Sequence, residues 1–337
     1  MLRIGLLGAG RIGQVHAANI ASNRESALVA VSDVNAAPAL SLANHYGAEV
    51  RETDAIIASD DIDAVLVATS TDTHANLIEA AAQAGKAVLC EKPVDLSLER
   101  AIACQANVAK TQSPVMVGFN RRFDPNFAAL KAAFDAGDIG TGELLSITSF
   151  DPAPPPVSYI KVSGGLFRDM MIHDFDLACW IFGGLPKTVS AFGSALVDPA
   201  IGEAGDVDTA VVTLTWADGR LAVIKNSRRA AYGYDQRIEL LGSGGLLGAK
   251  NVLENTVEKI TADGNKTAKP EHFFLERYAR AYQIEWASFL TAVATGSKMP
   301  ATLAEGVSSL ALAEAATRSA QSGETVEITS ELLGERA

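Results

Sequence analysis

Short apolar runs alternate with helical patterns along the first 120 residues. The runs are almost continuously hydrophobic, which is typical of parallel strands covered by helices on both faces. One intervening segment, residues 72–84, has Asp72 as a candidate N-cap and Gly85 as a stop signal, as a helix would. The pattern therefore predicts a parallel sheet with crossover helices, with strands at 3–8, 27–33, 63–70, 87–92 and 115–119.

After residue 120 the pattern changes. Residues 209–216 alternate strictly, with Ala, Val, Leu and Trp at the even positions, and Asp218-Gly219 is a hairpin signal before a second apolar stretch at 221–227. This alternation predicts antiparallel strands. The remaining predicted elements are a strand and turn at 234–245 and helices at 125–136, 274–295 and 302–321.

The two patterns predict two domains, which a length of 337 residues also favours. Residues 1–120 are expected to form an α/β domain with a doubly wound parallel sheet. Residues 121–337 are expected to form an α+β domain with a mostly antiparallel sheet. The second face of 209–216 is only mildly polar, so we expect it to pack against another copy of the chain, and a tetramer is favoured.

Composition narrows the function classes. The net charge is -12 and clustered basic residues are absent, which argues against a nucleic-acid partner. No apolar run reaches the roughly 20 residues that a membrane helix needs, and no signal-peptide pattern is present, so we expect a cytoplasmic protein without a membrane partner. The three cysteines have neither disulfide nor metal-ligand spacing, so we expect no metal site.

A glycine-rich turn follows the first predicted strand. It reads Gly8-Ala9-Gly10-Arg11-Ile12-Gly13, a G-x-G-x-x-G pattern that opens a helix, and Asp33 follows the second strand 20 residues after Gly13. Such glycines allow a tight turn and close approach of backbone N–H groups to a pyrophosphate, while the acid can accept hydrogen bonds from a ribose. The acid would repel the 2′-phosphate of NADP, so we predict NAD as the cofactor.

Polar residues follow the next predicted strands. In a parallel sheet the carboxyl ends of the strands lie at one edge, where ligands bind. The sequence therefore predicts that this edge carries Thr69, Ser70 and Thr71 after the third strand, Glu91-Lys92-Pro93 after the fourth, and Asn120-Arg121-Arg122 after the fifth. Thr69, Ser70, Glu91, Lys92 and the nearby His74 are the expected cofactor contacts.

The segment 164–180 places Asp169, His173, Asp174 and Asp176 among Met, Ile, Phe, Leu, Cys and Trp. Burying a charge costs several kcal/mol unless the charge is paired or neutralised, so the cluster is either an exposed face or a site. On a helix, Asp169 and His173 would share a face, whereas Asp174 would point elsewhere and cap or pair with an arginine.

Several separated motifs resemble the Gfo/Idh/MocA oxidoreductase family. They are CEKP at 90–93, GFNRRFDP at 118–125 and GG-x-F-x-D-x-x-x-HD at 164–174. The stretches DPAPPP (151–156) and YGYDQRIE (232–239) are similar to its inositol 2-dehydrogenase branch. The resemblance spans about residues 2–325 with the motifs in order, and it implies NAD-dependent oxidation of myo-inositol to scyllo-inosose.

The resemblance also implies residue roles. His173 would be the general base, Asp169 the substrate-binding acid, and Lys92 a contact of both nicotinamide ribose and substrate. A neutral histidine is suited to remove a hydroxyl proton near neutral pH, and a lysine favours a developing alkoxide. The positions that would contact a polyol ring are Arg122, Asp151 and Tyr234.

Other interpretations remain open. The enzyme could act on another inositol isomer or a sugar, and Phe150 and Cys179, where arginine would be expected, leave the substrate undecided. A non-catalytic NAD-binding sensor is a third hypothesis, which loss of Lys92 or His173 would have favoured. His16 is expected to be a packing or capping residue. For Arg122 and Asp151 a salt bridge or loop anchor competes with a substrate role, and Tyr234 could simply pack.

Overall fold

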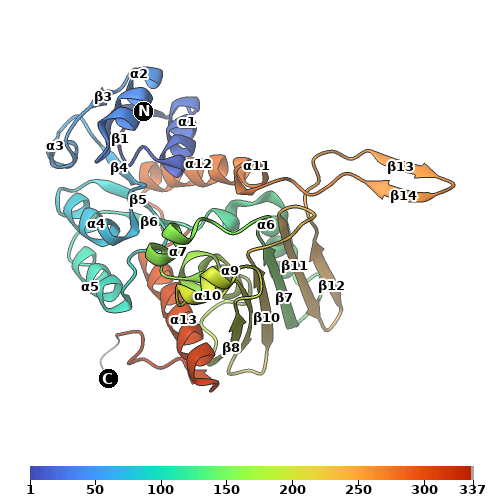
Figure 1. The fold of residues 1–337 in the computed structure, drawn as a ribbon. Coiled ribbons are helices and arrows are strands. Elements are labelled where there is room, and N and C mark those ends of the chain that lie inside the picture. The colour runs from blue at the N-terminus through green and yellow to red at the C-terminus, as the bar shows by residue number, and fades with distance from the viewer. Residues whose placement is uncertain (335–337) are drawn as a thin grey trace. The chain divides into compact units, whose positions relative to one another are not determined.

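The structure is a computed structural model that describes residues 1–334, and it divides into two compact units. The first unit comprises Met1–Asn120 and Ala281–Leu310, and the second comprises Arg121–Arg280 and the chain from Ala311 onward (Figure 1). The sequence-based division placed all of 121–337 in the second domain. The segment 281–310 belongs with the first unit instead, because helical periodicity does not reveal which sheet a helix covers.

The first unit contains a six-stranded sheet in the order β3-β2-β1-β4-β5-β6, in which every pairing is parallel. The chain order reverses between β1 and β4, as in a doubly wound fold. The predicted Rossmann-type sheet is therefore confirmed. The strands are β1 (Leu2–Leu7), β2 (Ser26–Ser32), β3 (Glu49–Val50), β4 (Ala64–Val67), β5 (Ala87–Glu91) and β6 (Val115–Gly118).

Helices connect these strands. The predicted helix at 72–84 begins later than expected, because Asp72 lies in a 3₁₀ turn, η1 (Thr71–Thr73), that precedes α4. The helices are α1 (Arg11–Ser22), α2 (Ala36–Tyr46), α3 (Thr53–Ala58), α4 (His74–Gln83), α5 (Leu98–Val108), α12 (Ala279–Thr295) and the start of α13 (Leu303–Ser322).

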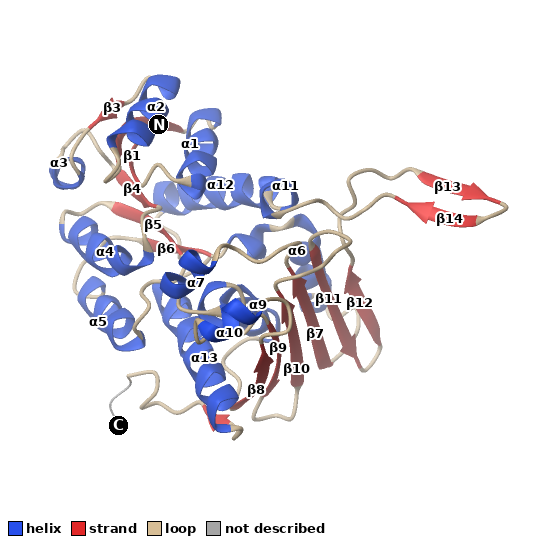
Figure 2. Cartoon of the chain, in the orientation of Figure 1, coloured by secondary structure: helices blue, strands red, loops and turns tan. Residues whose placement is uncertain are grey.

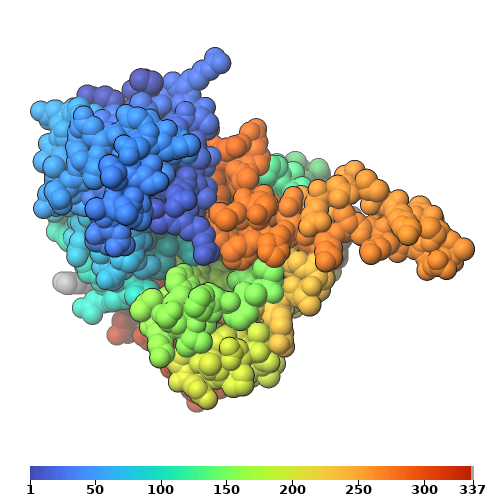
Figure 3. All heavy atoms as spheres, turned by 45° about the horizontal axis from the view of Figure 1, so that its top comes forward, coloured from blue at the N-terminus to red at the C-terminus, as the bar shows by residue number. Residues whose placement is uncertain are grey.

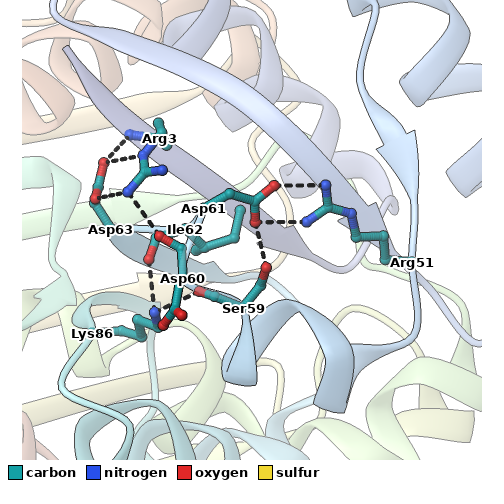
Figure 4. A network of polar contacts seen from close by, with 8 residues as sticks. All are labelled: Arg3, Arg51, Ser59, Asp60, Asp61, Ile62, Asp63 and Lys86. Atoms are coloured by element: carbon teal, nitrogen blue, oxygen red, sulfur yellow. Dashed lines mark hydrogen bonds and ion pairs between the residues drawn. The ribbon is translucent and has the colours of Figure 1, made fainter.

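A polar network ties together the start of β1 and the loop before β4 (Figure 4). Arg3 donates to both carboxylate oxygens of Asp63, at 3.0 and 2.7 Å, and Arg51 binds Asp61 through two bonds of 2.8 Å. Lys86 donates to two backbone carbonyls of the same loop. Arg3 lowers the pKa of Asp63. This network lies at the amino ends of β1 and β4. It therefore involves none of the polar residues at the carboxyl ends of these strands.

The returning segment 281–310 completes the first core. The Trp286 indole donates to Ser26 Oγ at 3.0 Å, and Val117 N donates to the Ala301 carbonyl at 2.9 Å. At Gly306 an added Cβ would lie 2.9 Å from a valine methyl of this core. The first sheet is thus packed by a segment that is distant in sequence.

The second unit is built on a mixed sheet in the order β12-β11-β7-β10-β9-β8-β15. Only the pairing of β7 with β10 is parallel. The predicted hairpin is confirmed, since β9 and β10 pair antiparallel and Gly219 adopts φ +92° in the turn. The strands are β7 (Gly142–Phe150), β8 (Thr188–Ser194), β9 (Thr209–Thr215), β10 (Leu221–Ser227), β11 (Asp235–Gly242), β12 (Gly245–Ala249) and β15 (Val326–Glu327).

One face of this sheet is buried, including Ala210, Val212 and Leu214 of β9. Large apolar side chains elsewhere on β8 to β12 are exposed: Phe192, Val211, Leu221, Leu241 and Leu246. The idea that this face packs against another copy stays a prediction.

The second unit also contains helices and a hairpin that the sequence pattern did not predict. This hairpin of β13 (Glu258–Thr261) and β14 (Gly264–Thr267) forms a narrow arm (Figures 2 and 3). The helices are η2 (Asn120–Phe123), α6 (Pro125–Asp135), α7 (Val157–Ser163), α8 (Leu166–Asp169), α9 (Ile172–Phe182), α10 (Pro199–Glu203) and α11 (Phe274–Arg277).

Candidate functional site

The glycine turn between β1 and α1 has a distinct reason for each glycine. Gly8 adopts φ +99°, and an added Cβ would lie 2.3 Å from the Ala68 carbonyl oxygen. At Gly13 an added Cβ would lie 2.1 Å from the Gly8 carbonyl oxygen. At Gly10 the same atom would meet nothing within 4 Å. The first and third glycines therefore allow tight packing, and the second leaves open space at the helix start.

Helix α1 begins at Arg11, and its N-terminus receives no side-chain cap. Arg11 is exposed and Ile12 is half-buried. The first N–H groups of a helix lack partners within the helix and favour an anion. Together with the open space at Gly10, this turn fits a pyrophosphate.

Asp33 directly follows β2 and contacts the glycine turn. Its Oδ2 accepts from Ala9 N at 2.6 Å, and its Oδ1 accepts from Asn35 N at 2.8 Å. A carboxylate can accept about four hydrogen bonds. The side chain is half-buried, so it retains capacity to accept from ribose hydroxyls.

The loop after β4 is held by hydrogen bonds. Thr69 Oγ1 lies 2.7 Å from Thr73 Oγ1, and the exposed Ser70 accepts from Thr73 through its carbonyl. The buried His74 ring lies 2.8 Å from the Pro93 carbonyl and 3.2 Å from the Thr69 carbonyl. His74 thus joins the loops that follow β4 and β5.

β5 ends at Glu91, whose carboxylate lies 2.7 Å from His16 Nε2 of α1. Both side chains are buried, and the following Lys92–Pro93 peptide bond is cis. Glu285 of α12 is fully buried, and neither of its oxygens has a hydrogen-bond partner among residues 1–334. Burial, and then the charge of Glu91, raise the pKa of Glu285 well above its usual range. The sequence pattern did not indicate that His16 and Glu285 lie near Glu91, the residue before the lysine.

In the second unit, the segment 164–180 forms two helices and not one. α8 ends at Asp169 and α9 begins at Ile172, with His173 in its first turn. At the junction Met171 N donates to the Leu166 carbonyl at 3.0 Å, a bond five residues long that interrupts the regular ladder. The segment is therefore helical but interrupted, so the shared face that a single helix would give Asp169 and His173 does not apply, and the two residues flank one junction instead.

Two buried ion pairs anchor α9. Arg121 Nη1 donates to Asp174 Oδ1 at 2.6 Å, and Arg122 donates to both oxygens of Asp176 at 2.8 and 2.6 Å. All four side chains are at most 4% exposed. Burial raises the pKa of Asp174, and the arginine opposes that shift. The expected arginine partner of Asp174 is thus present, and the contacts of Arg122 favour the salt-bridge interpretation over direct polyol contact.

Tyr159 and Arg228 contact Asp169. Tyr159 Oη donates to its Oδ1 at 2.9 Å, and both terminal nitrogens of Arg228 lie 3.4 Å from its Oδ2. The carboxylate side chain is 14% exposed, whereas Arg228 is 1% exposed. Asp169 therefore lies at the margin between the interior and the surface, where a ligand can reach it.

Asp151 and Tyr234 lie in the same unit. Asp151 follows β7, and burial raises its pKa to about 7 although Arg228 and Arg121 oppose the shift. Tyr234 is buried with its ring edge-on to Tyr278 at 6.0 Å, and burial raises its pKa well above the usual range. Asp151 can gain or lose a proton near neutral pH, whereas Tyr234 stays protonated.

Sequence reasoning missed Arg228, although a signal was present. The alternation of β10 buries Ala222 and Ile224, and continuing it by twos reaches Asn226 and Arg228, which are also buried. Polar residues on the buried face of a strand need partners, and such partners often belong to a site.

Among residues 1–334, no helix is both long and apolar enough to traverse a bilayer. No group of three or more His, Cys, Asp or Glu side chains in that range is arranged to hold a metal ion.

The parallel sheet, the glycine turn and the acid after β2 define a dinucleotide-binding protein of the oxidoreductase class. Comparison with known proteins identifies the family. Residues 2–119 match the oxidoreductase family with an NAD-binding Rossmann fold, and residues 127–247 match the GFO/IDH/MocA C-terminal domain. The chain belongs to the GFO/IDH/MocA oxidoreductase family, and its cofactor is NAD.

Similar proteins include the inositol 2-dehydrogenase of Rhizobium meliloti, which is 52% identical over 94% of this chain and 96% of that protein. A solved myo-inositol dehydrogenase from Corynebacterium glutamicum is 45% identical, covers 98% of this chain and 99% of that chain, and has a TM-score of 0.94. A scyllo-inositol dehydrogenase from Lactobacillus casei, solved with NAD(H) and scyllo-inositol, is 31% identical with a TM-score of 0.90 and covers 97% and 99%.

Proposed function

We propose that this protein oxidises myo-inositol at its C2 hydroxyl to scyllo-inosose, with NAD as the hydride acceptor. The observation that carries the proposal is the junction of α8 and α9, where Asp169 ends α8 and His173 lies in the first turn of α9, the helix that two buried ion pairs anchor. The 52% identical relative named inositol 2-dehydrogenase supports the substrate. This combination favours a catalyst over a non-catalytic NAD sensor.

The residues divide the work. His173 accepts the hydroxyl proton at Nε2, because Nδ1 of its ring is buried. Asp169 accepts hydrogen bonds from the polyol and stabilises the charged imidazole. Lys92 favours the developing alkoxide. When bound, NAD supplies the nicotinamide carbon that receives the hydride.

The first unit holds the cofactor. The glycine turn and the N-terminus of α1 bind the pyrophosphate, and Asp33 binds the adenosine ribose. Thr69, Ser70 and His74 shape the edge near the nicotinamide.

The test is a panel of inositol isomers and aldoses, each incubated with NAD or NADP, with reduced nicotinamide followed by absorbance. We expect the highest kcat/KM with myo-inositol and NAD. The Lactobacillus casei relative makes scyllo-inositol the second candidate substrate. Activity on glucose but on no inositol would contradict the proposal while leaving the family assignment intact.

His173→Ala should lower kcat by about 10²- to 10⁴-fold, the usual scale for a general base, while the Kd for NAD stays unchanged. His272→Ala is the matched control, since His272 is an exposed histidine of the same unit. Wild-type turnover in His173→Ala would remove this residue from the mechanism.

The apolar side chains exposed on the second sheet, among them Phe192 and Leu246, support a homo-oligomer, with a tetramer favoured. Such a face costs free energy in water unless it is covered. Light scattering at micromolar concentration should show the oligomer, and a monomer would refute it.

A further inference from the structure

Arg228 is a buried cation for which the chemistry above has no role. It follows β10 and is 1% exposed. Its terminal nitrogens lie 3.4 Å from Asp169 Oδ2, and Nη2 lies 3.8 Å from Asp206 Oδ2. A guanidinium stays charged in proteins, so its burial requires nearby carboxylates.

Asp206 contacts the start of α8, the short helix that ends at Asp169. Its Oδ1 accepts from Leu166 N, the first residue of α8, at 3.0 Å. Gly165 precedes that residue with φ +85°, and an added Cβ there would lie 2.8 Å from the same oxygen. Asp206 therefore binds the start of α8 while Arg228 binds Asp169 at its end.

We propose that Arg228 is a positioning residue for the polyol site, which fixes the orientation of Asp169 so that this carboxylate can accept hydrogen bonds from substrate hydroxyls. This inference rests on the proposed function. Arg228 acts through Asp169 and Asp206 together, because its guanidinium is shared between the two ends of α8. It does not itself bind the polyol.

The geometry separates this role from a purely structural one. The distances of 3.4 Å exceed the 2.7–2.9 Å typical of a tight charge-assisted bond, so Arg228 and Asp169 form a loose ion pair and not a tight bidentate one. Tyr159 approaches the other oxygen, Oδ1. The charge of Arg228 also opposes the rise in the pKa of Asp151 that burial causes, so Arg228 acts on a second residue that is expected to contact the polyol.

The experiment compares Arg228→Met, Arg228→Lys and Arg229→Met. Arg229 is the exposed neighbour and serves as the matched control. We expect Arg228→Met to raise KM for myo-inositol about 10- to 100-fold, with a smaller change in kcat and an unchanged Kd for NAD, because a lost polar contact to substrate is worth about one to two factors of ten. Arg228→Lys should recover part of the affinity for myo-inositol, since it keeps the charge but lacks the planar guanidinium that can contact two carboxylates.

The outcomes separate failure of this inference from failure of the proposed function. Circular dichroism shows whether the variants fold. If Arg228→Met does not fold, Arg228→Lys still tests the inference, because it retains the buried charge. A folded Arg228→Lys and Arg228→Met with wild-type KM would overturn the inference alone, as would equal losses in the Arg229 control. A wild-type enzyme inactive on every inositol would overturn the proposed function and this inference with it.

Discussion

Glu285 offers a quantitative test of the first core. Its carboxyl is fully buried without a hydrogen-bond partner among residues 1–334, and its pKa is raised well above the usual value of 4.5. The folded state therefore keeps a proton that the unfolded state releases above pH 4.5. Because the unfolded state binds fewer protons, the free energy of unfolding falls as pH rises from about 4.5 toward the folded-state pKa.

The size of the effect follows from linkage. A fully protonated folded state loses at most about 1.4 kcal/mol per pH unit, which amounts to about 2.5 kcal/mol between pH 5 and pH 7. Glu285→Gln keeps the shape and cannot ionise. The stability of Glu285→Gln relative to wild type should therefore increase by up to about 2.5 kcal/mol over that range.

Urea unfolding at pH 5, 6 and 7 measures this difference, followed by tryptophan fluorescence, to which Trp286 of the first unit contributes. Glu276→Gln is the control, because Glu276 is exposed, and its difference from wild type should stay flat. A Glu285→Gln difference that is equally flat from pH 5 to pH 7 would refute the conclusion that this carboxyl is protonated in the fold.

Three further predictions follow. Asp33→Ala should raise the Kd for NAD and relax rejection of NADP, and an unchanged cofactor preference in binding titrations would rule out Asp33 as the ribose contact. Gly13→Ala should weaken NAD binding at least tenfold and lower Tm, because its Cβ would lie 2.1 Å from the Gly8 oxygen; calorimetry that finds native affinity would contradict this. The free energy of unfolding of Asp151→Asn should rise relative to wild type as pH increases from about 4 and level off above about 7, because the folded-state pKa of Asp151 is raised to about 7. Chemical unfolding across that pH range measures the difference between variant and wild type. A difference that stays constant above pH 5 would show that the carboxyl is already ionised there.

Much of the fold could be predicted because its determinants are local. Parallel strands covered on both faces produce continuous apolar runs, and the β9–β10 hairpin follows from alternation around Asp218-Gly219. The segment 281–310 could not be assigned to the first unit, since an amphipathic helix shows that it has a buried face but not what covers it.

Some of the geometry of the candidate site was also predictable. The glycine turn and Asp33 are close in sequence to the elements that place them, so spacing sufficed to bring Asp33 to the glycine turn. The pairing of Arg122 with Asp176 spans 54 residues and depends on how η2 meets α9, which periodicity does not encode. The alternation of β10 indicates that Arg228 is buried, but not its partners, which lie on α8 and in the loop before β9.

The return of residues 281–310 to the first sheet also constrains synthesis on the ribosome. The strands of that sheet are complete by residue 118, but the indole that reaches Ser26 and the segment that pairs with β6 emerge up to 190 residues after Asn120. At about 5–20 residues per second the nascent sheet waits roughly 10 to 40 s with part of its apolar surface uncovered. Chaperone engagement during translation should therefore concentrate in this interval and end when α12 and the start of α13 have left the exit tunnel.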